Sequence, residues 1–267
     1  PIQAYLDYKG IVQIAVNSGC DAIHPGYGFL SENPEFADEC AKYNIIFVGP
    51  SPNIMRSLGN KVEAKKTAGK AKVPTIPSTG PLPKDLKKCK DLAKKIGYPI
   101  MLKASWGGGG RGMRVIKKET ELENHINTAR REAKSAFGKD DVFFEKLIEK
   151  AFHVEVQIIG DTHGNIVHLF ERDCSLQRRH QKVVERAPAA YLSDKERNAI
   201  CEAGVRIGKQ VNYSCAGTVE FLMDAKSRDF FFIEVNPRVQ VEHTVTEEIT
   251  GIDCLLYTSD AADDHHR

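Results

Sequence analysis

The first fifty residues combine a helical and a strand-like pattern of apolar positions. Ile11, Ile14 and Ala15 recur at the spacing of one helix face, which predicts a helix that ends before a glycine. Residues 22–24 and the apolar run at 45–48 predict short strands, and an Asn-Pro pair begins a second helix between them. Strands that alternate with helices in this way indicate a mostly parallel sheet.

The following hundred residues contain a small insert of mixed helix and strand. Two helical segments and a proline-rich link lead into it, at residues 54–58, 61–69 and 73–77. Within residues 81–147 the pattern then predicts a helix, a strand, a glycine loop, a second strand, a helix and a third strand. The three strands and the longer helix fall at residues 98–104, 112–116, 142–146 and 118–137.

Residues 153–253 combine strands with one long helix. Ser193 is a typical N-cap for a helix that extends to Gln210. Alternating or continuous apolar runs predict four strands, at residues 153–159, 166–171, 217–223 and 230–236. The last two strands flank a polar turn, so they are expected to form a hairpin.

Composition narrows the class of protein. The 267 residues are 41% hydrophobic and 28% charged, with a mean hydropathy of −0.37, which is the balance of a globular domain. No apolar run approaches the roughly 20 residues of a membrane span, so no membrane partner is expected. A net charge of +2 gives no bulk attraction to nucleic acid. Seven cysteines without a C-x-x-C pair favour a reducing, intracellular compartment.

A run of glycines at residues 107–110 follows the predicted strand that carries Lys103. Glycine backbones can turn their N–H groups toward a phosphate without a side chain in the way. The helix that a dinucleotide fold requires, the Gly-Lys-Ser/Thr of a P-loop and the downstream kinase motifs are all missing. A phosphate flap between two strands and a solvent-exposed turn are the alternatives. Lys103 favours the flap, because an apolar strand buries a lysine only beside an anion.

The predicted hairpin carries two carboxylates and an amide, on Glu220, Glu234 and Asn236. Mg²⁺ prefers such oxygen ligands and often shares them with substrate phosphates. Two glutamates on the wet face of an edge hairpin are the alternative. Just after the hairpin, Arg238 could bind a planar anion and Glu242 could act as a general base. A surface Arg–Glu pair at helical spacing is the alternative for these two residues.

A basic stretch at residues 171–182 follows a predicted strand and is expected to be a loop. Its basic residues are Arg172, Arg178, Arg179, His180 and Lys182. No aromatic residues are interleaved for base stacking, which weighs against a nucleic-acid site. A structural salt-bridge network and a site for a triphosphate or small anion both fit these charges, and the neighbouring phosphate motif favours the anion.

A phosphate flap, two separated lysines, an acidic hairpin and an Arg/Glu pair, in this order, are typical of ATP-grasp ligases. More specifically, residues 1–253 resemble the biotin carboxylase component of biotin-dependent carboxylases. The motifs that carry this resemblance are residues 24–33 (HPGYGFLSEN), 103–113, 171–182 and 238–243 (RVQVEH). Within the family, residues 154–157 (VEVQ) and 244–248 (TVTEE) look most like the pyruvate carboxylases.

The resemblance implies a role for each matching residue. ATP would be bound by Lys61, Lys103, Gly107, Gly108, Gly109, Gly110, Glu145, Lys146, Ile148, His153, Gln177 and His180. Mg²⁺ or Mn²⁺ would be held by Glu220, Glu234 and Asn236. Lys182 and Arg238 would fix bicarbonate, and Glu242 would deprotonate it.

The resemblance also implies the fold and the reaction. The fold is α/β: an ATP-grasp domain at residues 58–253 with a lid subdomain at about 75–147, preceded by a truncated parallel-sheet (pre-ATP-grasp) domain at residues 1–57. The reaction is ATP-dependent carboxylation of biotin on a carrier domain, in which bicarbonate forms carboxyphosphate. It is the first half-reaction of a biotin-dependent carboxylase. The full-length enzyme would be a homo-oligomer in the cytoplasm or the mitochondrial matrix.

Residues 254–267 match nothing in this family, and we expect them to be a foreign tail. The family continues at this point through a further domain that adds another arginine to the site, so we expect the 267-residue chain to be inactive alone. The residues themselves leave two other functions open. One is an ATP-grasp ligase of the carbamoyl-phosphate synthetase type, and the other is a non-catalytic ATP-binding module.

Overall fold

The computed structural model describes residues 2–106, 113–179 and 181–257. Its first part is a short α/β segment that consists of a 3-10 helix, α1, β1, α2 and β2. These elements span Ile2–Leu6, Tyr8–Asn17, Ala22–Ile23, Pro34–Lys42 and Ile46–Phe47. The two strands pair in parallel, with Ala22 opposite Ile46, which confirms the predicted β-α-β arrangement.

Local sequence explains how the helices of this segment are placed. Asn33 caps α2 as predicted, since its side chain accepts a hydrogen bond from the Phe36 amide at 2.8 Å. On α1, Val12 and Ala15 form the buried face, three residues apart. Ile14 was expected on that face but is 67% exposed, because the helical rotation of about 100° per residue turns it away from both.

Two helices, α3 (Pro52–Gly59) and α4 (Lys61–Lys70), connect this segment to the lid subdomain. The lid consists of α5, β3, β4, a 3-10 helix, α6 and β5, at Leu86–Ile96, Ile100–Ala104, Arg114–Ile116, Glu119–Glu121, Leu122–Phe137 and Val142–Lys146. Its strands form an antiparallel sheet in the order β4-β3-β5. Apolar residues of α5 and α6 pack against the fully buried strand β3, so the lid has a hydrophobic core of its own.

The largest sheet has five antiparallel strands in the order β10-β9-β6-β7-β8. Strands β6 to β10 span Ala151–Gly160, Ile166–Arg178, Gln181–Arg186, Cys215–Asp224 and Phe230–Asn236. Helix α7 (Asp194–Gln210) begins after its predicted cap Ser193 and packs on one face, where alternate residues of β6 enter the main core. The intervening residues His153, Glu155 and Gln157 face the other side, because side chains alternate along a strand.

The basic stretch at residues 171–182 is not a loop, contrary to expectation. β7 continues through it and β8 returns beside β7, while His180 lies outside the described residues. The strand structure of this stretch was not predicted, because its charged residues interrupt the alternation of apolar and polar positions that is typical of a strand. Here the charges are paired, because the fully buried Arg172 lies opposite Glu155 of β6. A further helix that was not predicted, α8 (His243–Thr250), follows β10.

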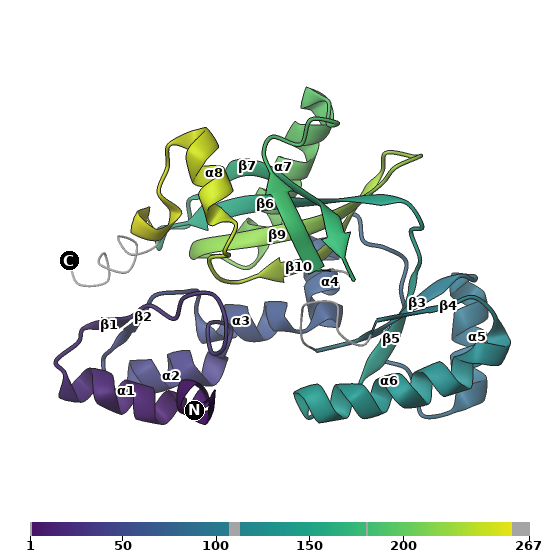
Figure 1. Ribbon diagram of the computed structural model, residues 1–267, viewed down its shortest axis with the longest axis horizontal. Coiled ribbons are helices and arrows are strands. Elements are labelled where there is room, and N and C mark those ends of the chain that lie inside the picture. Colours follow the sequence, from purple (N-terminus) through teal and green to yellow (C-terminus); the bar gives the residue numbers. More distant parts are fainter. Residues whose placement is uncertain (1, 107–112, 180, 258–267) are drawn as a thin grey trace.

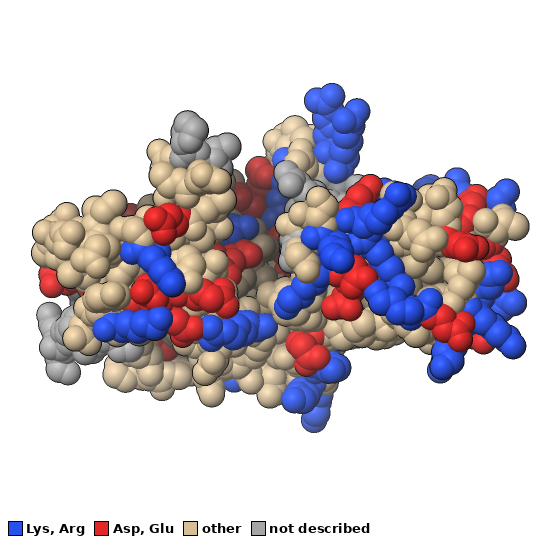
Figure 2. All heavy atoms as spheres, turned by 90° about the horizontal axis from the view of Figure 1, so that it is seen from below, with Lys and Arg blue, Asp and Glu red and all other residues tan. Residues whose placement is uncertain are grey.

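Figure 1 shows how these parts are arranged: the five-stranded sheet at the top, the N-terminal segment at the lower left and the lid at the lower right, with α3 and α4 between them. Lys and Arg side chains cover much of the lid on the right of Figure 2, and α5 contributes the exposed Lys87, Lys88, Lys94 and Lys95. No helix in the described part of the chain combines the length and apolar content that a membrane crossing requires.

Candidate active site

A cavity of about 960 Å³ lies between the sheet of the lid and the five-stranded sheet. Every predicted site residue that the structure describes lines it. These residues are Lys61, Lys103, Glu145, Lys146, Ile148, His153, Gln177, Lys182, Glu220, Glu234, Asn236, Arg238 and Glu242. The other predicted residues, Gly107, Gly108, Gly109, Gly110 and His180, lie outside the described residues. Side chains from α4, the lid and the large sheet therefore meet in one cavity.

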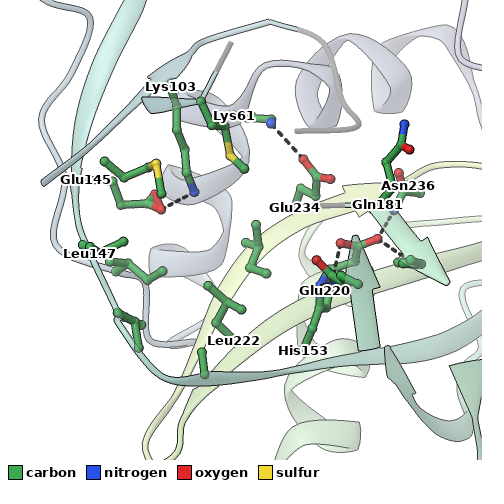
Figure 3. Close-up of a pocket in the computed structure, with 18 of the residues that line it drawn as sticks. Lys61, Lys103, Glu145, Leu147, His153, Gln181, Glu220, Leu222, Glu234 and Asn236 are labelled. Carbon is green, nitrogen blue, oxygen red and sulfur yellow. Dashed lines mark hydrogen bonds and ion pairs between the residues drawn. The ribbon is translucent and has the colours of Figure 1, made fainter. Parts of the chain in front are cut away.

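At the lid end of the cavity, Lys103 and Glu145 face each other from neighbouring strands (Figure 3). Lys103 Nζ donates to Glu145 Oε1 at 2.5 Å, and Lys65 of α4 donates to Oε2 of the same carboxylate. All three side chains are at most 10% exposed. Burial would raise the pKa of Glu145, but the two lysines outweigh burial and lower it. The anion expected beside the buried Lys103 is therefore the carboxylate of Glu145.

The two acidic residues of the hairpin lie directly opposite each other, Glu220 on β9 and Glu234 on β10. Glu220 Oε1 accepts a hydrogen bond from Asn236 at 2.8 Å, and Oε2 accepts one from His153 Nε2 at 2.8 Å (Figure 3). Glu234 forms an ion pair with Lys61 at 3.1 Å. Because Glu220 is only 5% exposed, the alternative of two glutamates on a wet face is wrong.

Lys182 of β8 lies among three carboxylates. Its Nζ donates to Glu220 at 2.9 Å, to Glu242 at 2.8 Å and also to Glu155. Burial would lower the pKa of Lys182, but these carboxylates raise it above its ordinary value. Burial would likewise raise the pKa of Glu220 and Glu242, yet His153 and Lys182 hold the pKa of Glu220 well below its usual range, and Lys182 lowers that of Glu242. Lysine and carboxylates are therefore charged together near neutral pH.

Arg238 pairs with the N-terminal segment and not with Glu242. Its Nε donates to Glu32 Oε1 at 2.8 Å. Residues 237–242 are not helical and α8 begins only after them, so the alternative of an Arg–Glu pair at helical spacing is wrong. Because Tyr27 also lines the cavity, the N-terminal segment contributes both a carboxylate and an aromatic ring to the surroundings of the site.

A buried arginine supports this site from behind. Arg172 donates from Nε to Glu155 at 2.5 Å, and from Nη1 to Gln157 at 2.9 Å and to Thr246 of α8 at 2.7 Å. Since Glu155 also accepts from Lys182, one carboxylate joins the buried arginine to the cavity. The charges of the basic stretch thus serve both a structural network and the site.

Sequence reasoning missed Glu155 and Lys65, which pair with the cavity residues Lys182 and Glu145. The signal for Glu155 was the recurrence of polar residues at every second position of β6, in a strand that is otherwise apolar. The signal for Lys65 was its position one helical turn after Lys61, which places both on one face of α4.

The donor atoms at the hairpin fit a hard divalent cation. Carboxylate and amide oxygens of Glu220, Glu234 and Asn236 are the ligand type that Mg²⁺ prefers. Within the described ranges, no group of three or more His, Cys, Asp or Glu side chains is arranged to hold a metal ion. Two carboxylates and one amide would therefore need phosphate or water oxygens to complete a coordination shell.

Comparison with known proteins decides the family. The family model described as carbamoyl-phosphate synthase L chain, ATP binding domain, matches residues 60–263. The model of the biotin carboxylase N-terminal domain matches residues 1–55. The chain belongs to the biotin carboxylase family. The N-terminal domain thus comes first and the ATP-binding domain follows it, as the sequence predicted.

Similar biotin carboxylases include both long relatives and solved domains. Pyruvate carboxylase from Bacillus subtilis is 55% identical over 255 residues, which are 96% of this chain and 22% of that protein. A biotin carboxylase β-γ-ATP complex from Campylobacter jejuni matches with a TM-score of 0.94 and 47% identity, over 97% of this chain and 58% of that one.

A third similar protein is the biotin carboxylase domain dimer of the Hydrogenobacter thermophilus 2-oxoglutarate carboxylase, in complex with MgADP, ADP and bicarbonate. It matches with a TM-score of 0.95 and 45% identity, over 98% of this chain and 58% of that one. The predicted α/β fold of biotin carboxylase, an ATP-grasp fold, is thereby confirmed. The chain spans 22% of the length of the Bacillus pyruvate carboxylase that it matches.

Proposed function

We propose that this biotin carboxylase chain carries the site for ATP-dependent carboxylation of biotin, the first half-reaction of a carboxylase of the pyruvate carboxylase type. One observation carries the proposal: Lys182 lies between Glu220 and Glu242 in the same cavity as Lys61 and Lys103. Phosphoryl transfer depends mainly on positioning and on neutralising charge, which such a cluster provides. The relatives' complexes with ATP, MgADP and bicarbonate support this assignment.

The nucleotide is proposed to lie along the lid side of the cavity. Lys61 and Lys103 would neutralise its phosphates, and residues 145–148, where β5 leaves the lid, would flank the adenine. His153 and Gln177 are in contact, with Nδ1 and Nε2 2.6 Å apart, and would lie near the ribose and phosphates. The remaining predicted nucleotide contacts are Gly107, Gly108, Gly109, Gly110 and His180.

Glu220 and Glu234, with Asn236 beside them, are proposed to hold Mg²⁺ against the nucleotide phosphates. When bound, the ion would neutralise the negative charge of the transferring phosphoryl group. The carboxylate oxygens already pair with the ammonium groups of Lys61 and Lys182, which supports a binding site for a cation.

Bicarbonate is proposed to bind between Lys182 and Arg238, and Glu242 to take its proton. The lowered pKa of Glu242 keeps the carboxylate ionised near neutral pH, as a proton acceptor must be. A bicarbonate oxygen then bonds to the γ-phosphorus while the bond from that phosphorus to the β–γ bridging oxygen breaks, which yields carboxyphosphate and ADP. Carboxyphosphate divides into CO₂ and phosphate, the phosphate takes the biotin N1′ proton, and N1′ bonds to CO₂.

The variant Glu242→Gln tests the proposed catalytic role. In a chain completed to the length of the Bacillus subtilis relative, we expect bicarbonate-dependent ATP cleavage to fall by about a hundredfold or more, because the amide cannot accept the proton. The affinity for MgADP should stay unchanged, because Glu242 is not assigned to the nucleotide. An unchanged rate of ATP cleavage would show that Glu242 is not the base.

The proposal includes partners and a location. The carboxyl acceptor would be biotin on a carrier domain, and the complete enzyme would be a homo-oligomer, as the dimer of the Hydrogenobacter domain supports. An intracellular, reducing compartment is supported by the seven cysteines, which are all free thiols.

We also propose the domain division expected from the sequence, with a first domain at residues 1–57 and an ATP-grasp domain at 58–253 that includes the lid. The matched ranges 1–55 and 60–263 support the boundary between the two. The foreign origin of residues 254–267 stays a prediction. Cys254 in this tail is buried, and residues 258–267 lie outside the described residues.

A further inference from the structure

Glu145 has two lysine partners that reach it from different sides. Lys103 donates to Oε1 at 2.5 Å from the adjacent strand, and Lys65 donates to Oε2 from α4. Among the described residues, those that line the cavity include Lys103 and Glu145 but not Lys65. Lys65 therefore holds the carboxylate from behind the cavity wall.

The surroundings of Lys65 leave it dependent on this carboxylate. Besides Glu145, its ammonium group contacts the Ile76 carbonyl at 3.5 Å and lies 5.2 Å from the centre of the Phe143 ring. Its side chain is 10% exposed. Burial, with a smaller effect of the neighbouring Lys103, lowers the pKa of Lys65, and Glu145 acts in the opposite direction. The two buried groups thus stabilise each other in their charged forms.

Positive charges outnumber negative charges in the cluster of Lys65, Lys103 and Glu145. Two ammonium groups, on Lys65 and Lys103, share the single carboxylate of Glu145. If Lys103 were the only partner, its movement to a phosphate would leave a buried carboxylate without a cation, which is strongly unfavourable. With Lys65 in place, Glu145 keeps one cation and the other is available to a ligand.

We infer that Lys65 is a positioning residue for nucleotide binding: it keeps Glu145 paired while Lys103 leaves that carboxylate for a nucleotide phosphate. The inference rests on the proposed function, in which Lys103 binds phosphate. It extends the role of α4, which would supply Lys61 to the phosphates directly and Lys65, one turn later, to the residue behind them.

Titration calorimetry of the 267-residue chain with MgADP and with adenosine tests this inference. We expect Lys65→Met to weaken MgADP binding by about tenfold or more, because the movement of Lys103 to a phosphate would then leave the buried Glu145 carboxylate without a cation. Adenosine carries no phosphate, so its affinity should be unchanged. Lys65→Arg should restore MgADP binding, because arginine keeps the cation.

Two further variants make the result specific. Lys66→Met is the matched control, since Lys66 is the next residue of α4, is 63% exposed and pairs with the surface residue Glu63. This variant should bind both ligands as the unaltered chain does. In the Glu145→Gln background no carboxylate needs a cation, so Lys65→Met should then weaken MgADP binding much less than it does alone.

The possible contrary results are distinguishable. Unchanged MgADP affinity in Lys65→Met would overturn the inference, and so would an equal loss of MgADP and adenosine affinity, which would indicate a merely structural role. If the unaltered chain bound neither MgADP nor adenosine, the proposed function itself would fail, together with the inference that rests on it.

Discussion

At the scale of single residues, the partners of three carboxyl groups in the cavity affect their pKa more than burial does. Burial alone would raise the pKa of Glu145, Glu220 and Glu242, but lysine and histidine partners lower the pKa of all three carboxyls. The partners are supplied by neighbouring strands and by α4 and need no ligand. The charges of the proposed site are thus in place without a ligand, and such preorganisation reduces the cost of charge rearrangement.

His153 gives this arrangement a pH dependence. Burial would lower the pKa of His153, but Glu220 outweighs burial and raises it above 6.5. A histidine with a raised folded pKa contributes stability that is complete below the unfolded value and is lost as the pH rises through the folded value. We therefore expect His153→Asn to lower the melting temperature most at about pH 6, with the deficit shrinking toward pH 9. Calorimetry across this range would disprove the ion pair if the deficit were constant.

At the scale of elements, strands β6, β7 and β9 are joined to α8 by charged and polar groups as well as by apolar contacts. Arg172 is completely buried and bonds to Glu155 of β6, Thr218 of β9 and Thr246 of α8. Its loss would leave Glu155 with one cation, Lys182, on which two further carboxylates depend. Arg172 and Lys182 therefore share the Glu155 carboxylate, and Arg172 also bonds α8 to the sheet.

We expect Arg172→Met to lower the free energy of unfolding by about 3 kcal/mol or more, because it breaks a buried ion pair. The matched control is Arg186→Met. Arg186 also pairs with an acidic residue of β7, Asp173, but its side chain is 65% exposed, so its loss should cost about 1 kcal/mol or less. Urea unfolding of both variants measures the difference. An equal loss of unfolding free energy in the two variants would show that the buried ion pair stabilises the fold no more than the exposed one.

The elements that could be predicted from sequence are those with local signals. Ser193 and Asn33 mark the beginnings of α7 and α2 through their own hydrogen bonds, and the apolar runs of the hairpin mark β9 and β10. Strand β8 could not be predicted, because its charged residues find their partners on other strands. Helix α8 is short and follows a polar stretch, so no apolar stripe identified it.

At the scale of the whole molecule, the family resemblance predicted thirteen described residues that do line one cavity. It was not sufficient to predict the contacts within it. Lys103 and Glu145 meet because β3 and β5 are neighbours in the lid, and Arg238 meets Glu32 because the N-terminal segment lies beside the loop after β10. Tertiary packing determines such partners, since Lys103 and Glu145 are 42 positions apart in the sequence and Glu32 and Arg238 are 206 apart.

The central claim is that bicarbonate attacks the γ-phosphate of ATP within this cavity. The most direct test supplies ¹⁸O-labelled bicarbonate, with ATP and biotin, to the chain completed to the length of the Bacillus subtilis relative. Because the oxygen that attacks phosphorus remains on phosphorus when carboxyphosphate divides, the inorganic phosphate should carry one labelled oxygen per ATP cleaved. Mass spectrometry of that phosphate measures the label. Phosphate free of label, with ATP still cleaved, would contradict the account.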